Sequence, residues 1–262
     1  LKLVTALCHN TDQLSQALFA DRLDMVFLPL LRGGPTDGDP PLTDQQREHI
    51  MKLTARTITH MFVGNRALCS EFSTLLTQTV VDQMRVFGKS LDLLQILKPL
   101  IIVDGKAVEI SQTNVSKSFI EKSGGLDGRL MTDEWGPGPA MDFQQVVEHA
   151  VTNPSVDGGE PLRQEMELEY TCLLTEVVGM CARGLMPHTE LRASSMLPFD
   201  QCMDRLLMLY QDKALAQFQD DDKLVSIKRC TLQFLNDVFI DSDSEFTQAV
   251  VQQRMNGLWT MP

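Results

Sequence analysis

The fold class of this chain follows from residues 227–259, IKRCTLQFLNDVFIDSDSEFTQAVVQQRMNGLW. The first half of this stretch spaces its apolar side chains three and four residues apart, as on one face of an α-helix. The apolar positions are Ile227, Cys230, Phe234, Leu235 and Val238, and the polar positions expected to face away from them are Lys228, Arg229, Gln233 and Asn236. A polar run at residues 241–244 follows, and its side-chain oxygens can accept hydrogen bonds from free backbone N–H groups. The stretch therefore predicts a helix, a polar break and a second helix that begins at Glu245 or Phe246.

The second of these helices has a counterpart near the N-terminus. Residues 246–259 align without a gap with residues 14–27, and the identical pairs are Gln16/Gln248, Ala17/Ala249 and Arg22/Arg254. In both copies an apolar helix and a short polar break come first. The same order of helix, break and helix is found in two further places, which are residues 50–63 and 68–86 around Gly64-Asn65, and residues 170–183 and 191 onward around Pro187.

Four such units predict an all-α fold, and more specifically an armadillo-like α-solenoid of helix-turn-helix repeats. The alternative is an irregular all-helical domain in which the similarity of residues 14–27 and 246–259 arose by chance.

Other helices are expected between these units. Apolar periodicity places them at residues 89–102, 107–120 and 143–150, and from Leu197 through Leu209. Pro99 is expected to kink the first of them, and Asp104-Gly105 is predicted to form a tight turn. The most regular helical series is Tyr170, Leu173, Leu174, Val177, Val178 and Cys181.

Three segments rich in glycine and proline are predicted to be loops, because they offer turn-forming residues and little to bury. These loops are Gly33–Pro41, Ser123–Ala140 and Asn153–Pro161. We expect them to border contacts with neighbouring domains.

Charge and hydrophobicity exclude two classes of protein. The 262 residues contain 35 acidic and 23 basic side chains, which gives a net charge of −12. Such a surface repels phosphate backbones and anionic lipid, so nucleic acid is not an expected partner. The chain has neither an apolar run long enough to span a membrane nor an N-terminal signal peptide. We therefore expect a soluble segment of a longer chain.

The motif Asp241-x-Asp243-x-Glu245 resembles the start of a calcium-binding loop. However, Phe246 replaces the glycine that the loop needs at its sixth position, and Gln252 replaces the bidentate glutamate at its twelfth. We interpret these acids as part of a helix break, and we predict no metal-binding residue.

Enzymatic chemistry has little support in the sequence. His49 and His60 are three helical turns apart, too far to share a metal, and no phosphate-binding or nucleophile motif is present. The six cysteines are predicted to be reduced and to pack in the core, with no C-x-x-C pair among them. The 14 methionines could line an adaptable groove, but core positions explain most of them. We predict no catalytic residue, no cofactor and no small-molecule ligand.

Several strings together resemble the helical domain shared by ryanodine receptors and inositol trisphosphate receptors. In chain order these strings are Phe87–Leu97, Ile102–Val108 with a following helix that contains Gln112, Leu168–Leu174, Met196–Asp200, Lys228–Glu245 and Leu258-Trp259. Their order is similar to that of the second copy of this domain in inositol trisphosphate receptors. The resemblance covers residues 87–262, and it leaves residues 1–86 as separate N-terminal helical repeats.

This resemblance implies an armadillo-like solenoid in the cytosolic part of a tetrameric intracellular calcium-release channel. The parent protein would then be integral to the endoplasmic reticulum or a related calcium-store membrane. The partners of the segment would be neighbouring domains and subunits. Its role would be to transmit conformational change from the ligand-binding region toward the pore. The ligand site and the pore of that family lie elsewhere, so the resemblance assigns no functional residue here.

A second hypothesis is a soluble armadillo-type scaffold that binds peptide or protein partners and has no connection with channels. The acidic balance of the chain predicts basic peptides as its partners.

Overall fold

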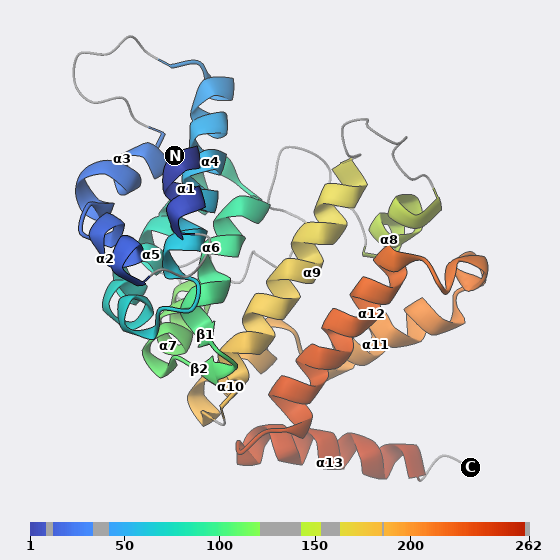
Figure 1. Ribbon diagram of the computed structural model, residues 1–262. Coiled ribbons are helices and arrows are strands. Elements are labelled where there is room, and N and C mark those ends of the chain that lie inside the picture. Colours follow the sequence, from blue (N-terminus) through green and yellow to red (C-terminus); the bar gives the residue numbers. More distant parts are fainter. Residues whose placement is uncertain (9–12, 34–41, 121–142, 153–162, 185, 260–262) are drawn as a thin grey trace. The chain divides into compact units, whose positions relative to one another are not determined.

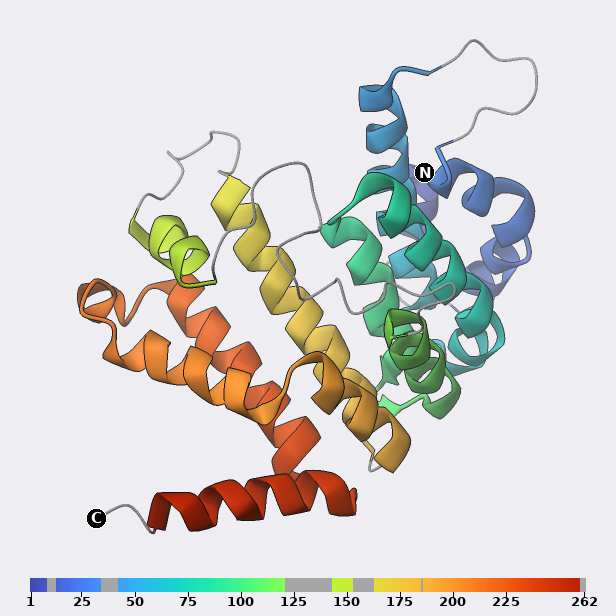
Figure 2. The same ribbon diagram turned by 180° about the vertical axis from the view of Figure 1, so that it is seen from behind.

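The computed structural model, shown in Figures 1 and 2, describes residues 1–8, 13–33, 42–120, 143–152, 163–184 and 186–259. Helices make up nearly all of the regular structure in these ranges, so the predicted all-α class is confirmed. Two compact units are present, Leu1–Ser118 and Phe119–Pro262. The three predicted loops lie almost wholly outside the described residues.

The first unit contains short helices at its start and longer ones after residue 43. Its elements are α1 (Lys2–Cys8), α2 (Gln13–Ala20), the π-helix η1 (Leu23–Phe27), α3 (Leu28–Leu31), α4 (Asp44–Phe62), α5 (Arg66–Phe87), α6 (Leu91–Ile101), β1 (Ile102–Val103), β2 (Lys106–Ala107) and α7 (Glu109–Ile120). The last two residues of α7 belong to the second unit.

Both helices of the α4–α5 pair begin at a residue whose side chain caps the helix, and the second of these residues lies in the predicted break. The Thr43 side chain accepts from the Gln46 amide, and the Gln46 side chain accepts from the Thr43 amide, which together form a capping box. Asn65 caps α5 by accepting from the Leu68 amide at 3.2 Å. Its Nδ2 also donates to the buried Gln16, at 3.2 Å. The predicted break at Gly64-Asn65 is therefore confirmed, and one of its residues also links α5 to α2.

A β-hairpin follows α6 where the sequence predicted only a tight turn. Ile102 pairs with Ala107 and Val103 pairs with Lys106, and Asp104 and Gly105 have φ values of 50° and 73°. Positive φ at both central residues gives the turn the twist that a two-residue hairpin needs, which is why Asp-Gly is favoured there. Because Ala107 is held in β2, α7 begins at Glu109, two residues later than the predicted helix start.

The predicted domain boundary at residue 86 differs from the division of the structure. The reason is α6, which packs against both α4 and α5 and so belongs to the first unit. Its apolar side chains are buried there, with Leu93, Leu94 and Leu97 all at 0% exposure.

The second unit is built around α9. Its elements are α8 (Phe143–Thr152), α9 (Arg163–Ala182), α10 (Pro187–Met196), α11 (Phe199–Gln211), the 3-10 helix η3 (Ala216–Phe218), α12 (Asp222–Leu235), the π-helix η4 (Asn236–Ile240) and α13 (Glu245–Trp259). α9 packs against α8, α10 and α12. In both views α12 runs beside α9, and α13 crosses near the end of α12 (Figures 1 and 2).

The apolar series predicted on α9 is confirmed as its buried face, since every one of its six side chains is buried. α12 approaches this face closely at Gly179, where a Cβ would lie 3.4 Å from both the backbone and the ring of Phe234. A separate apolar cluster joins α8 to the α11–α12 pair, and it includes Val147, Leu209 and Ile227.

Two details of the predicted repeats are wrong. Pro187 does not belong to a break, because it is the first residue of α10, where its fixed φ suits a helix start and its missing N–H has no helical partner to lose. The two aligned copies also differ in form, since residues 14–27 divide between α2 and η1 whereas residues 246–259 lie in the single helix α13. Gln16 is fully buried but its counterpart Gln248 is exposed, so the copies occupy different environments.

Candidate functional site

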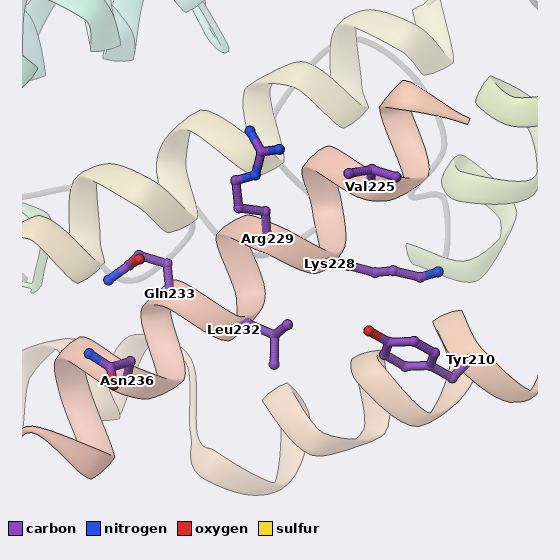
Figure 3. A pocket seen from close by; sticks show the side chains of 7 residues that line it. All are labelled: Tyr210, Val225, Lys228, Arg229, Leu232, Gln233 and Asn236. Atoms are coloured by element: carbon purple, nitrogen blue, oxygen red, sulfur yellow. The ribbon is translucent and has the colours of Figure 1, made fainter. Parts of the chain in front are cut away.

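An open groove of about 600 Å³ runs along α12 beside α11 (Figure 3). Five of its lining residues come from α12, and one each comes from α11 and η4. They are Val225, Lys228, Arg229, Leu232, Gln233, Tyr210 and Asn236. Tyr210 is 58% exposed and Leu232 is 47% exposed, so the groove offers apolar surface to a partner.

Lys228 lies in this groove as a buried cation. Only 9% of the residue is exposed, which corrects the prediction that it faces away from the core. Its Nζ lies 4.5 Å from the centroid of the Tyr210 ring and donates to Oε1 of Gln219. Both contacts are neutral. A π-face and an amide oxygen replace part of the water that the ammonium loses on burial, but neither carries a full negative charge.

Arg229 follows Lys228 and is exposed. Among the described residues it has no ion-pair partner. Figure 3 shows its side chain leaving α12 on the side away from Tyr210. The seven lining residues include two cations and no carboxylate. The groove is thus locally basic on a chain whose net charge is −12.

Sequence reasoning did not single out this groove. Lys228, Arg229 and Gln233 were assigned to the polar face of an amphipathic helix, and Tyr210 was not considered at all. The sequence contained one indication of the groove, namely the adjacent basic residues Lys228 and Arg229 in a chain with 35 acidic and 23 basic side chains. The contribution of α11 could come only from tertiary structure.

The polar break before α13 is anchored by Glu190 of α10. Glu190 is fully buried, and its Oε2 accepts from the Ser244 amide at 3.0 Å and from the hydroxyl of Ser242. The Ser242 hydroxyl also contacts the hydroxyl of Thr247 in the first turn of α13. The predicted helix break is confirmed, and this buried network fixes it to α10.

The acidic residues of the motif that resembles a calcium-binding loop are not part of this hydrogen-bond network. Asp241, Asp243 and Glu245 are exposed and alternate with the buried serines, so their carboxylates point away from the inside of the loop. Within the residues that the structure describes, no three His, Cys, Asp or Glu side chains are grouped so as to hold a metal ion.

The six cysteines are free thiols at buried or half-buried positions. Burial raises the pKa of the Cys69 thiol and of the Cys202 thiol to about 12 in each case. Cys172 of α9 and Cys230 of α12 share a hydrogen bond, which raises the pKa of Cys172 and lowers that of Cys230. Thiols that stay protonated at neutral pH are poor nucleophiles, so Cys69 and Cys202 are suited to packing.

The two weighed histidines lie on the single helix α4. His49 is exposed and His60 is half-buried, and eleven residues of helix separate them by about 16 Å. Met51, Met61 and Met84 are fully or almost fully buried in the first unit, and no methionine lines the groove. The core interpretation of those three methionines is therefore confirmed.

No protein-family model matches this chain. A curated relative does. The chain is similar to the inositol 1,4,5-trisphosphate receptor itr-1 of Caenorhabditis elegans, with 25% identity over 193 residues. The matched part is 74% of this chain but only 6% of the receptor, so the chain spans a small part of that protein's length.

The sequence strings that resemble the receptor family can be placed on the helices and the hairpin of the structure. Phe87–Leu97 covers the end of α5 and most of α6, and Ile102–Val108 forms the hairpin. Leu168–Leu174 lies within α9, and Met196–Asp200 connects α10 to α11. These strings therefore lie mostly in packed helices and in the hairpin. Within the described residues, no helix is both long enough and apolar enough to cross a membrane.

Proposed function

We propose that this chain is a non-enzymatic helical-repeat segment of an intracellular ligand-gated calcium-release channel resembling the inositol trisphosphate receptor. The observation that carries the proposal is the similarity over 193 residues to such a receptor, in a chain whose described residues are mostly helical. The segment transmits conformational change from the ligand-binding region toward the pore. Its parent is a tetrameric protein of the endoplasmic reticulum or a related calcium store, and its partners are neighbouring domains and subunits.

The proposed mechanism is mechanical, and the helix pairs act as its stiff parts. Within the second unit, α9 and α12 bury a continuous apolar interface that includes Val177 and Phe234, at 0% and 1% exposure. Close-packed interfaces of this kind resist gradual deformation and move as units. In an armadillo-like solenoid, small rotations at the joints between such units add along the chain.

The break at residues 241–244 is the joint that the structure describes in most detail. Glu190 holds its backbone, and Ser242 links Glu190 to the start of α13 through Thr247. A buried network of this kind transmits a displacement of α10 to α13 because its hydrogen bonds are directional and shielded from water. Loosening it is expected to weaken coupling without touching a ligand site.

The test is Ser242→Ala in the parent channel, with Ser226→Ala as its matched control. Ser226 is an exposed residue of α12, so its hydroxyl can be replaced by water. Ligand affinity and ligand-evoked calcium release are measured on the same membranes. Ser242→Ala is expected to reduce release while ligand affinity stays unchanged, and Ser226→Ala is expected to change neither.

Unchanged release in the Ser242→Ala channel would overturn the coupling role, provided that amide exchange shows the start of α13 to be loosened. Tight binding of inositol trisphosphate by the isolated chain would also overturn it, because the segment would then be a ligand site. The size of the endogenous protein gives a further check. A modest-sized chain that alkaline carbonate releases from membranes would exclude a channel parent.

A peptide-binding scaffold is the second candidate, and the groove beside α12 favours it. The groove corrects one part of that hypothesis. The net charge predicted basic peptides, whereas the surface that is shaped to receive a partner carries Lys228 and Arg229.

A further inference from the structure

The partner chemistry of the groove can be inferred from Lys228. Lysine is seldom buried unless its charge is paired, because removing an ammonium from water costs free energy that only an anion returns in full. Lys228 is 91% buried, since 9% of the residue is exposed. Its contacts are the Tyr210 ring and the Gln219 amide oxygen, and no salt bridge to a described residue is formed. A carboxylate would supply the full negative charge that neither of these contacts carries.

The other polar residues that line the groove also favour a negatively charged partner. Arg229 also lines the groove and adds a second positive charge on the edge away from Tyr210, and Gln233 and Asn236 continue the lining with neutral amides. The chain as a whole has an excess of 12 negative charges, so a positively charged groove is the place where an acidic partner is attracted and not repelled.

The floor of the groove is apolar surface that a free anion would leave exposed. Tyr210 and Leu232 are each about half exposed and face one another across the groove in Figure 3. Leu207, one helical turn before Tyr210 on α11, is 46% exposed and extends this apolar surface. A partner that covers it has to bring apolar side chains beside its carboxylates.

The backbone of the groove favours a helical partner. The walls are α11 and α12, whose N–H and C=O groups are bonded within each helix apart from the helix ends. An extended peptide would find no ladder of donors and acceptors here, so its own backbone groups would stay unpaired on burial. A helix satisfies its own backbone. From Val225 to Asn236 the groove follows α12 for eleven residues, or about 16 Å, which is the length of three helical turns.

We propose that the groove between α11 and α12 binds an acidic amphipathic helix of a partner protein. One carboxylate of the partner pairs with Lys228 and another with Arg229, and apolar residues spaced three and four apart rest on Tyr210, Leu232 and Leu207. This inference goes beyond the proposed coupling role and does not depend on a channel parent, because it concerns only the surface of this chain.

The first experiment is a selection on the purified 262-residue chain from a display library of random 16-residue peptides. The selected peptides are then counter-selected against the Arg229→Glu variant, which retains the apolar surface but reverses the rim charge. The proposal expects enriched sequences with Leu, Ile or Phe at helical spacing and flanking Asp or Glu. Enrichment of basic or extended proline-rich sequences would overturn it, and so would enrichment that does not depend on Arg229.

The affinity of an enriched peptide is then measured by fluorescence anisotropy with matched variants. Arg229→Glu is expected to weaken binding about tenfold or more, and Leu232→Asp by a similar factor, because each removes one of the two contacts that the partner needs. Arg47→Glu is the control. It makes the same charge change at an exposed arginine of the first unit and is expected to alter the dissociation constant less than about twofold.

Lys228→Met tests the buried cation itself. Methionine retains the length of the side chain and removes the charge, so the variant is expected to fold and to lose affinity for the acidic peptide. If Lys228→Met unfolds the second unit, Arg229→Glu and Leu232→Asp still decide the outcome. A scrambled peptide of the same composition separates charge from helix recognition. Equal binding of the scrambled peptide would overturn the proposal, because the groove would then respond to charge alone.

Discussion

Replacement of Phe234 by alanine tests the interface on which both proposals depend. Phe234 is 1% exposed and packs where α12 comes closest to α9. A Cβ built on Gly179 would lie 3.4 Å from its ring, and its centroid lies 6.3 Å from that of Phe239 in an edge-to-face arrangement. Truncation removes a large buried side chain and leaves its space to be filled by the surrounding helices.

The expected cost is in the upper half of the range for such truncations. Phe→Ala changes in cores cost about 3–5 kcal/mol, and the cost rises when the site cannot collapse. One wall of the cavity is the backbone of α9 at Gly179, and a backbone wall relaxes less readily than side chains do. The edge-to-face contact with Phe239, worth about 0.5–1.5 kcal/mol, is part of this loss. We therefore expect Phe234→Ala to lower the free energy of unfolding of the second unit by about 4 kcal/mol.

Urea denaturation followed by circular dichroism and amide exchange measures this loss. With a urea dependence of about 2 kcal/mol/M, the midpoint is expected to fall by about 2 M for the transition that unfolds α9 and α12. Phe246→Ala is the control, since Phe246 is 58% exposed on α13 and its truncation is expected to stay within about 0.5 kcal/mol. A loss below about 1.5 kcal/mol for Phe234→Ala, or equal losses for the two variants, would refute the packing of α12 on α9.

Three further predictions concern named interactions. Arg183→Ala is expected to lower the free energy of unfolding, measured by urea denaturation, by about 1–2 kcal/mol, because it removes the 2.7 Å ion pair of the buried Asp237. The control Arg229→Ala breaks no ion pair and is expected to change this free energy by less than about 0.5 kcal/mol. Asn65→Ala is expected to lower the free energy of unfolding of the first unit by about 1–2 kcal/mol, since the side chain caps α5 and also donates to a buried glutamine; no loss would show that the cap is not formed. Burial on folding raises the pKa of the Cys69 thiol from 9.0 to about 12, so the stability contributed by the protonated thiol is fully present below pH 9 and falls by about 1.4 kcal/mol per pH unit above it. The Cys69→Ala variant is expected to lose this part of the alkaline pH dependence of stability. An identical pH dependence in both proteins would contradict the burial of this thiol.

Local chemistry explains the elements that could be predicted. The apolar series that starts at Tyr170 could form only one buried helical face, and that face is buried along its whole length in α9. The cap at Asn65 and the turn at Asp104-Gly105 follow from properties of single residues, namely a short side-chain acceptor and tolerance of positive φ. The prediction at Pro187 failed because proline is compatible with both a break and the first turn of a helix.

The candidate site was largely beyond reach of the sequence. Lys228 looked like a solvent-facing residue because periodicity places a side chain relative to its own helix and not relative to the next one. Its burial depends on Tyr210 and Gln219, which a neighbouring helix and a neighbouring turn bring against it. Likewise, the acids of the 241–245 break drew attention from the sequence, whereas the structure gives the anchoring role to Ser242 and to Glu190, 52 residues away.

By itself, then, the sequence determined the all-α class, most helices, the breaks at Gly64-Asn65 and at residues 241–244, and the resemblance to inositol trisphosphate receptors, because spacing, capping and turn preferences act over a few residues. Tertiary structure alone decided where the units divide, which polar side chains are buried, and where the groove beside α12 lies. These features depend on contacts between residues far apart in the chain. Many arrangements of the same amphipathic helices satisfy the local rules, and only packing selects among them.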